Sequence, residues 1–193
     1  MNDPMEGLHR ESALFKRNKN YESMTSKVKE QIDSIGIASL TEIHNLEPMW
    51  AYYADGFSGM CVAYSMRKLL SGLPSDHELV RMNYSEDPPI LLNNRDSADF
   101  RAKLALSSKT LRWSHEREWR LIRPTSGKAE YKDKDTVTAV YLGARVKQDY
   151  RKLIIDAMGE LSIRVYEMEI EKYFISFKPL KTQRKIARVT RKT

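Results

Sequence analysis

The stretch MWAYYADGFSGMCVAYS, residues 49–65, predicts a helix, a turn and a strand in immediate succession. Pro48 suits the first turn of a helix over residues 49–54, because its missing amide hydrogen is not needed there. The glycines of the DGFSG segment favour a turn. The alternation of side chains over residues 60–66 then predicts a half-buried strand. The stretch therefore indicates a domain that combines helices with strands.

Five aromatic residues are concentrated in this stretch: Trp50, Tyr52, Tyr53, Phe57 and Tyr64. On the predicted helix, Trp50 and Tyr53 share a face, and with Tyr64 they are expected to fill the core, because aromatic side chains bury large areas. That assignment gives Tyr52 and Phe57 no structural role. A second interpretation is that one or two of the rings line a pocket for a flat ligand. Both interpretations stay open.

Length and composition indicate a globular protein. The chain has 193 residues, of which 41% are hydrophobic and 31% charged, as expected for one domain with a real core. No window approaches the roughly 18 apolar residues of a membrane span, and the start of the sequence lacks the apolar segment of a secretory signal. The single cysteine, Cys61, excludes an internal disulfide and a cysteine-rich zinc site. We expect a cytoplasmic protein without contact to a membrane.

The net charge of +7 is localised rather than spread. Residues 178–193 contain seven basic residues and no acidic one, which leaves 26 of each sign in residues 1–177. We therefore predict a neutral domain over residues 1–177 and a basic tail over residues 178–193. The tail is either a solvated extension or a contact surface for nucleic acid or an acidic partner. A helix formed on contact would align its predicted binding residues, Lys181, Arg184, Lys185, Arg188 and Arg191.

The remaining patterns complete an α+β prediction. Helices are expected over residues 8–33, 97–112 and 148–158, and strands over residues 34–40, 79–84, 118–123, 136–143, 161–168 and 173–177. No linker is long enough to separate two domains. The fold class predicted is a single α+β domain with short mixed or antiparallel strands packed with helices.

The segment HEREWR, residues 115–120, carries the candidate chemistry. As a strand it would place Glu116, Glu118 and Arg120 on one face, about 6–7 Å apart at each step. Two carboxylates at that spacing repel, so one should have a raised pKa unless Arg120 compensates. Carboxylates with unequal pKa values can divide catalytic roles. The alternatives are an exposed Glu–Arg ladder without chemistry, and a metal site completed by residues such as Asp3, Glu6 or His115. No spacing demands a metal, and none is expected.

Four segments resemble an uncharacterised bacterial family, domain of unknown function 2971. They are NDPMEG (2–7), the stretch from IASLTEIHNLEP to the aromatic residues above (37–64), KTLRWSHEREWRLI (109–122) and VYLGARV (140–146). The third fits a Lys-x-x-x-Trp-x-x-Glu-x-Glu-x-Arg element. The resemblance covers nearly the whole chain up to about residue 177, in the family's order, and implies no activity. The family usually has a further segment before Asn-Asp-Pro, so we expect a shortened member or a late start.

A more distant similarity is to ADP-ribosyltransferases. Those enzymes carry a Ser-x-Ser/Thr strand element upstream of a Glu-x-Glu element, as Ser39-Leu40-Thr41 and Glu116-Arg117-Glu118 are ordered here. The resemblance implies an ADP-ribosyltransferase-like fold with NAD as cofactor. Its remaining signature, an Arg or His on the opening strand, would lie before residue 1, and the gap of 75 residues between Thr41 and Glu116 is longer than in many such enzymes.

The similarity also assigns roles to residues. Glu118 would be the catalytic carboxylate that binds the nicotinamide ribose as an oxocarbenium-like centre forms, and Glu116 would activate the acceptor. Ser39 would support the nicotinamide pocket, with Tyr52 or Tyr53 beside the nicotinamide. The predicted function is ADP-ribosyl transfer or NAD cleavage. The alternative is a non-enzymatic module that binds nucleic acid or protein through the basic tail.

Overall fold

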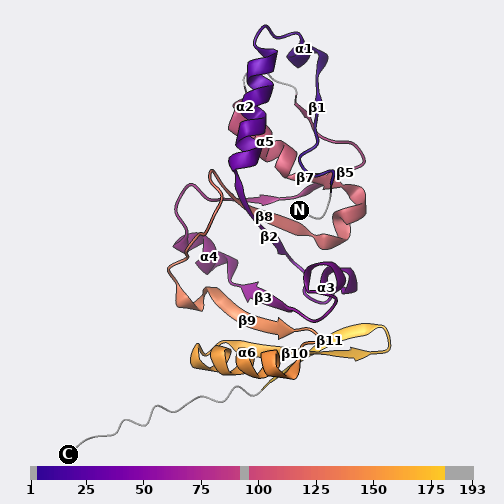
Figure 1. Ribbon diagram of the computed structural model, residues 1–193, viewed down its shortest axis with the longest axis vertical. Coiled ribbons are helices and arrows are strands. Elements are labelled where there is room, and N and C mark those ends of the chain that lie inside the picture. The colour runs from indigo at the N-terminus through magenta and orange to yellow at the C-terminus, as the bar shows by residue number, and fades with distance from the viewer. Residues whose placement is uncertain (1–3, 92–95, 181–193) are drawn as a thin grey trace, which may run out of the picture. The chain divides into compact units, whose positions relative to one another are not determined.

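The computed structural model describes residues 4–91 and 96–180 (Figure 1). Its contacts divide the chain into two compact units, which are described separately. Unit 1 comprises Met1–Ile43 and Pro74–Glu130, and unit 2 comprises His44–Leu73 and Tyr131–Thr193. Helices and mixed sheets occur throughout, which confirms the α+β class. The extent of the predicted domain, residues 1–177, stays a prediction.

Unit 1 is built around a three-stranded antiparallel sheet in the order β2-β8-β4. Two short parallel pairs, β1 with β6 and β5 with β7, lie outside that sheet. The elements of unit 1 are β1 (Arg10–Glu11), α1 (Ala13–Lys16), α2 (Tyr21–Ser34), β2 (Gly36–Thr41), β4 (Glu78–Arg81), β5 (Asn83–Ser85), β6 (Ile90–Leu91), α5 (Ala98–Leu106), β7 (Ser108–Thr110), the 3₁₀ helix η1 (Leu111–Glu116) and β8 (Glu118–Arg123).

The core of unit 1 lies between α2, α5 and one face of this sheet. Ile35, at the end of α2, packs with Ala102 and Leu106 of α5 and with Ile122 of β8, and all four are buried. Ile37 of β2 adds to this cluster from the neighbouring strand. Figure 1 shows α2 and α5 side by side, in agreement with their many contacts. Burial of these apolar side chains orients β8, the strand that carries the candidate carboxylate Glu118.

The helix predicted over residues 97–112 is shorter than expected, and this changes the candidate site. Helix α5 begins after Ser97, whose hydroxyl accepts from the Phe100 amide, and ends at Leu106. The hydroxyls of Ser107 and Ser108 both donate to the carbonyl of Leu104, at 3.3 and 3.0 Å. Serine side chains that bond the preceding turn compete with continued helix. The chain therefore leaves the helix and continues as β7 and η1.

Unit 2 contains a four-stranded mixed sheet in the order β11-β10-β9-β3. Strands β9 and β10 are parallel and are joined by α6, whereas the two outer pairs are antiparallel. The elements are α3 (Glu47–Tyr53), β3 (Met60–Tyr64), α4 (Met66–Gly72), η2 (Lys134–Thr136), β9 (Val137–Leu142), α6 (Gln148–Glu160), β10 (Arg164–Glu171) and β11 (Phe174–Pro179). Among residues 4–91 and 96–180, no helix combines the length and apolarity needed to span a membrane.

The aromatic stretch forms the predicted helix-turn-strand corner of unit 2, with one exchange of roles. Trp50 is 2% exposed, and its indole N–H donates to the His44 carbonyl at 2.7 Å. Phe57 packs against the buried cluster that contains Trp50, whereas Tyr53, expected in the core, is 49% exposed. The reason is the turn: Phe57 has φ +72°, a left-handed conformation that the sequence pattern did not indicate.

Candidate active site

Three elements of unit 1 bring Lys109, Glu116 and Glu118 together. Lys109 lies on β7, Glu116 ends η1, and Glu118 begins β8. The Lys109 Nζ lies 2.6 Å from Glu116 Oε2 and 3.2 Å from Glu118 Oε2. The prediction that residues 115–120 form one strand is wrong, because Arg117 has φ +46° and separates η1 from β8. The two carboxylates nevertheless share one ammonium group.

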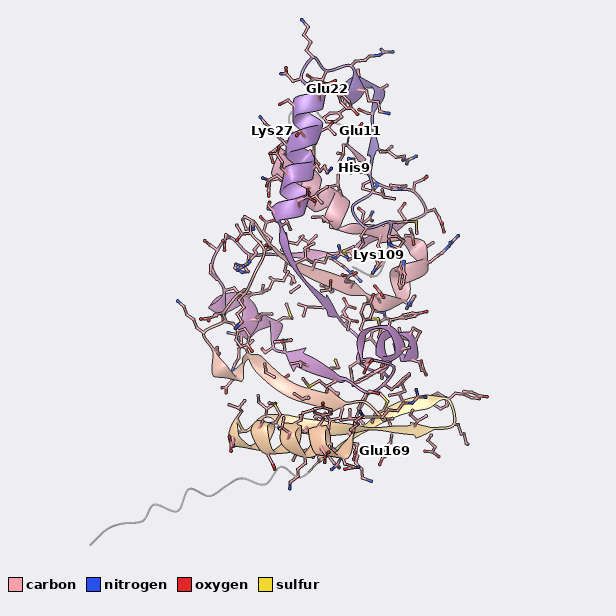
Figure 2. The ribbon with its side chains drawn as sticks, in the orientation of Figure 1. His9, Glu11, Glu22, Lys27, Lys109 and Glu169 are labelled. Carbon is pink, nitrogen blue, oxygen red and sulfur yellow. The ribbon has the colours of Figure 1, made fainter. Side chains whose placement is uncertain are left out.

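Arg120 extends this arrangement into a buried charge cluster, which we define as Glu6, Lys109, Glu116, Glu118 and Arg120. The Arg120 Nε donates to Glu118 Oε1 at 2.8 Å, and a terminal nitrogen donates to the Leu106 carbonyl at 2.6 Å. Its other terminal nitrogen pairs with Glu6. No side chain of the cluster is more than 7% exposed. Figure 2 labels Lys109 in unit 1.

The surroundings of Glu118 keep its carboxylate ionised. Burial alone would raise the pKa of Glu118, but hydrogen bonds from Arg120 and Ser39, with the positive charges of Arg120 and Lys109, hold it below its usual value. This is the compensation by Arg120 that the sequence left open. An ionised carboxylate accepts hydrogen bonds and stabilises positive charge, but it is not a proton donor near neutral pH.

The lowered pKa of Glu118 predicts a specific acid sensitivity. The stability it contributes is fully present above its unfolded pKa of about 4.3 and is lost as pH falls through the lower folded value. We expect the parent to lose more free energy of unfolding on acidification than Glu118→Gln, so that the difference between them begins to shrink at about pH 4.3 and vanishes only below the folded pKa. Urea denaturation between neutral and acid pH measures this. Glu169→Gln, at an exposed position of β10 in unit 2 (Figure 2), is the control. If the free energies of unfolding of the parent and of Glu118→Gln changed in parallel with pH, the expectation would be contradicted.

Strand β2 places Ser39 beside Glu118. Ser39 faces Arg120 in the antiparallel register, and Thr41 faces Glu118. Side chains of directly paired residues lie on the same face of a sheet, so Ser39 and Glu118 share a face, and Ser39 helps to hold the pKa of the Glu118 carboxylate low. Ser39 is exposed, whereas Glu118 is 5% exposed. Ser39 is therefore a solvent-exposed position on the same sheet face as this carboxylate.

The backbone near both carboxylates is also fixed by side chains. The Thr41 hydroxyl donates to the Glu116 carbonyl at 2.6 Å. The Glu118 amide donates to the Tyr84 hydroxyl at 2.8 Å, and burial raises the pKa of that tyrosine. These contacts tie β2 and β5 to the segment that joins η1 to β8.

The other predicted site residues lie elsewhere. Tyr52 and Tyr53 are on α3 of unit 2, where they are 62% and 49% exposed. Asp3 and the five tail residues predicted to bind nucleic acid, Lys181, Arg184, Lys185, Arg188 and Arg191, lie outside the described residues. Within the described ranges, no group of three or more His, Cys, Asp or Glu side chains is arranged to hold a metal ion. The roles of Ser39, Glu116 and Glu118 toward NAD stay predictions.

Lys109 is the residue of the cluster that sequence reasoning missed, because it fell within the helix predicted over residues 97–112. A signal was present in the element Lys-x-x-x-Trp-x-x-Glu-x-Glu-x-Arg. Its five specified positions are Lys109, Trp113, Glu116, Glu118 and Arg120. Four of them belong to the buried charge cluster, and the Lys109 ammonium lies over the Trp113 ring, 4.8 Å from its centroid. The residues that this sequence element specifies therefore lie close together in the folded unit.

Residues 49–121 match the family described as Protein of unknown function (DUF2971). The match includes the aromatic corner of unit 2 and most of the buried charge cluster of unit 1. It supports the resemblance within those residues, and the family description assigns no activity. No curated protein and no solved structure matches the chain. Similarity to ADP-ribosyltransferases stays a prediction.

Proposed function

We propose that unit 1 binds the ribose of NAD at Glu118 and catalyses ADP-ribosyl transfer or NAD cleavage. The observation that carries this proposal is the position of Ser39 on β2, which shares a face of the sheet with the ionised Glu118 of the adjacent strand β8 and helps to hold the pKa of that carboxylate low. These are the serine and the glutamate to which the motif resemblance assigns such chemistry. Their position on the same face of two neighbouring strands supports it.

The acceptor capacity of Glu118 fits a ribose hydroxyl. An ionised carboxylate offers about four lone-pair sites. Arg120 uses one on Oε1 and Lys109 uses one on Oε2. The proposal places a ribose hydroxyl donor at a remaining site, on the side of Ser39. The exposed side of Ser39 is the direction from which a ligand approaches.

NAD supplies a glycosidic bond between ribose C1′ and the nicotinamide nitrogen. When that bond breaks, its electron pair leaves with nicotinamide and positive charge develops on the ribose, where the Glu118 carboxylate stabilises it. Water or an acceptor group provides the electron pair of the new bond to C1′. Its proton passes to Glu116, which Lys109 holds beside Glu118. No change of oxidation state is involved.

The test combines NAD binding with nicotinamide release. NAD at about 100 times its Kd should add about 2.7 kcal/mol to the free energy of unfolding and raise the melting temperature. Glu118→Gln should abolish release of nicotinamide, measured by chromatography. Ser39→Ala alters an exposed position, so the fold should be retained while the NAD-induced shift becomes smaller. Glu169→Gln, distant in sequence and in the other unit, should behave as the parent. Absence of both shift and nicotinamide release in the parent would refute the proposal.

A further inference from the structure

Helix α6 of unit 2 has a second apolar face. Its inner side chains Ile154, Ile155 and Met158 pack against the core of Val140, Leu142 and Val165. A separate stripe faces solvent: Tyr150 is 63% exposed, Leu153 66% and Leu161 63%. With Ala157 between them, these positions are three or four residues apart and follow one line along the helix. A helix on the surface of a globular unit is normally polar on its outer side, so this stripe indicates a docking surface.

The stripe has an acidic flank. At about 100° per residue, Asp149, Asp156 and Glu160 fall together on one side of it, and all three are exposed. On the other side Arg151 is engaged by Glu167 through two hydrogen bonds of 2.6 and 3.0 Å. A segment that is both basic and partly apolar therefore complements this surface.

The chain itself supplies such a segment next to α6. Leu180, at the end of the described residues, packs against the same core that α6 covers, and its amide donates to the Val165 carbonyl at 2.8 Å. The last described residue before this segment therefore packs against the core that α6 covers. Residues 181–193 contain no acidic residue, two branched apolar ones, Ile186 and Val189, and six basic ones, Lys181, Arg184, Lys185, Arg188, Arg191 and Lys192.

We propose that the apolar stripe of α6, with its acidic flank, is the docking surface for residues 181–193 of the same chain. Ile186 and Val189 cover the stripe, and the basic side chains pair with Asp149, Asp156 and Glu160. The segment has thirteen residues, as many as α6, so it reaches along the helix in any conformation, since even the helical form spans about 20 Å. Its attachment at Leu180 provides an effective concentration in the millimolar range, so weak contacts suffice.

A second copy of the chain fits this surface less well. In an antiparallel pair of α6 helices related by a two-fold axis, each flank meets the same flank of the partner, which places acidic side chains against acidic ones. In a parallel pair the acidic flank meets the side of Arg151, which Glu167 already engages. The charge distribution thus favours a basic segment.

The experiment uses the full chain with a spin label on Thr190→Cys in a Cys61→Ala background. Amide signals of α6 should lose most of their intensity through paramagnetic relaxation. Leu153→Ser combined with Asp156→Asn should restore them. The control Tyr173→Ser, at a 93% exposed aromatic position of the same unit, should leave the broadening unchanged. At about 1 M salt, where the Debye length falls to about 3 Å, the broadening should weaken.

Two results would overturn the proposal. The first is full intensity of the α6 signals in the labelled parent, or broadening that Leu153→Ser/Asp156→Asn leaves unaltered. The second is broadening of α6 in an isotope-labelled chain by a spin label on a different copy, which would make a second copy the occupant. Broadening within one chain that the paired substitution removes supports docking of residues 181–193.

Discussion

Lys109→Met is expected to lower the free energy of unfolding by about 3–5 kcal/mol, the usual cost of removing one partner from a buried ion pair. The Lys109 ammonium is bonded to both Glu116 and Glu118, and the three side chains are 4%, 2% and 7% exposed. Without it, Glu116 and Glu118 stay buried and lose the positive charge that they share. Equilibrium urea denaturation of the parent and the variant gives the difference.

The matched control is Lys103→Met. Lys103 also bridges two carboxylates, Glu78 at 2.7 Å and Asp99 at 2.9 Å, but these are 54% and 43% exposed. Exposed ion pairs contribute about 0–1 kcal/mol, so this substitution should have a small effect. The two lysines have similar partners and distances, and they differ in burial. Equal losses in the two variants would show that burial is not the cause.

A charge-balanced double variant separates the lost ion pair from lost packing. Lys109→Met/Glu116→Gln removes one positive and one negative charge, so it should be more stable than Lys109→Met alone. Coupling of about 0.5–3 kcal/mol between contacting residues is normal in such double-mutant cycles. Additive effects of the two substitutions would contradict a direct charge interaction between Lys109 and Glu116.

The elements that carry the cluster could be predicted from the sequence to different degrees. Strand β8 was predicted with its observed limits, because residues 118–123 include the bulky or β-branched side chains of Trp119, Leu121 and Ile122, which favour a strand. Strand β2 was also predicted. The site around them was not, because Lys109 follows helix-favouring residues, and Ser107 and Ser108 end the helix before it by bonding the preceding turn. Such local serine bonds compete with the helix without changing the apolar pattern that predicts it.

Ion pairs between residues that are far apart in the sequence were a second feature of the site that the sequence did not predict. The pairing of Glu6 with Arg120 joins residues that no local pattern relates. The sequence did indicate that Arg120 could compensate a carboxylate two residues earlier, since side chains at that spacing share a strand face. Lys109, which β7 contributes to the buried charge cluster, meets the carboxylates for a different reason. The chain reverses through η1 and through Arg117, which has a left-handed conformation.

In unit 2, the burial of the aromatic residues of the corner could also be predicted only in part. Periodicity correctly placed Trp50 in the core, because a helix repeats its buried face every three to four residues. It could not distinguish Tyr53 from Phe57, since the inward orientation of Phe57 depends on positive φ values at Asp55 and Phe57. Non-glycine residues in that conformation are uncommon, so the pattern gave no reason to expect them.

Trp50→Ala is expected to lower the free energy of unfolding by about 3–5 kcal/mol, because it removes a large ring from a packed core. The indole ring lies 5.8 Å from the Phe177 ring, centroid to centroid, and packs among Ala54 and Met168. The substitution also leaves the His44 carbonyl without its indole donor. Thermal and urea denaturation followed by circular dichroism measure the loss.

Tyr173→Ala provides the control for this effect, since Tyr173 is an aromatic residue of the same unit that is 93% exposed. Its replacement should change stability by no more than about 0.5 kcal/mol, as is usual at exposed positions. Trp50→Phe keeps much of the ring volume but not the N–H donor, so its loss should fall between the two. If Trp50→Ala unfolded at the same urea concentration as the parent, the corner would not be structural. Its aromatic rings would then have to be explained by ligand binding.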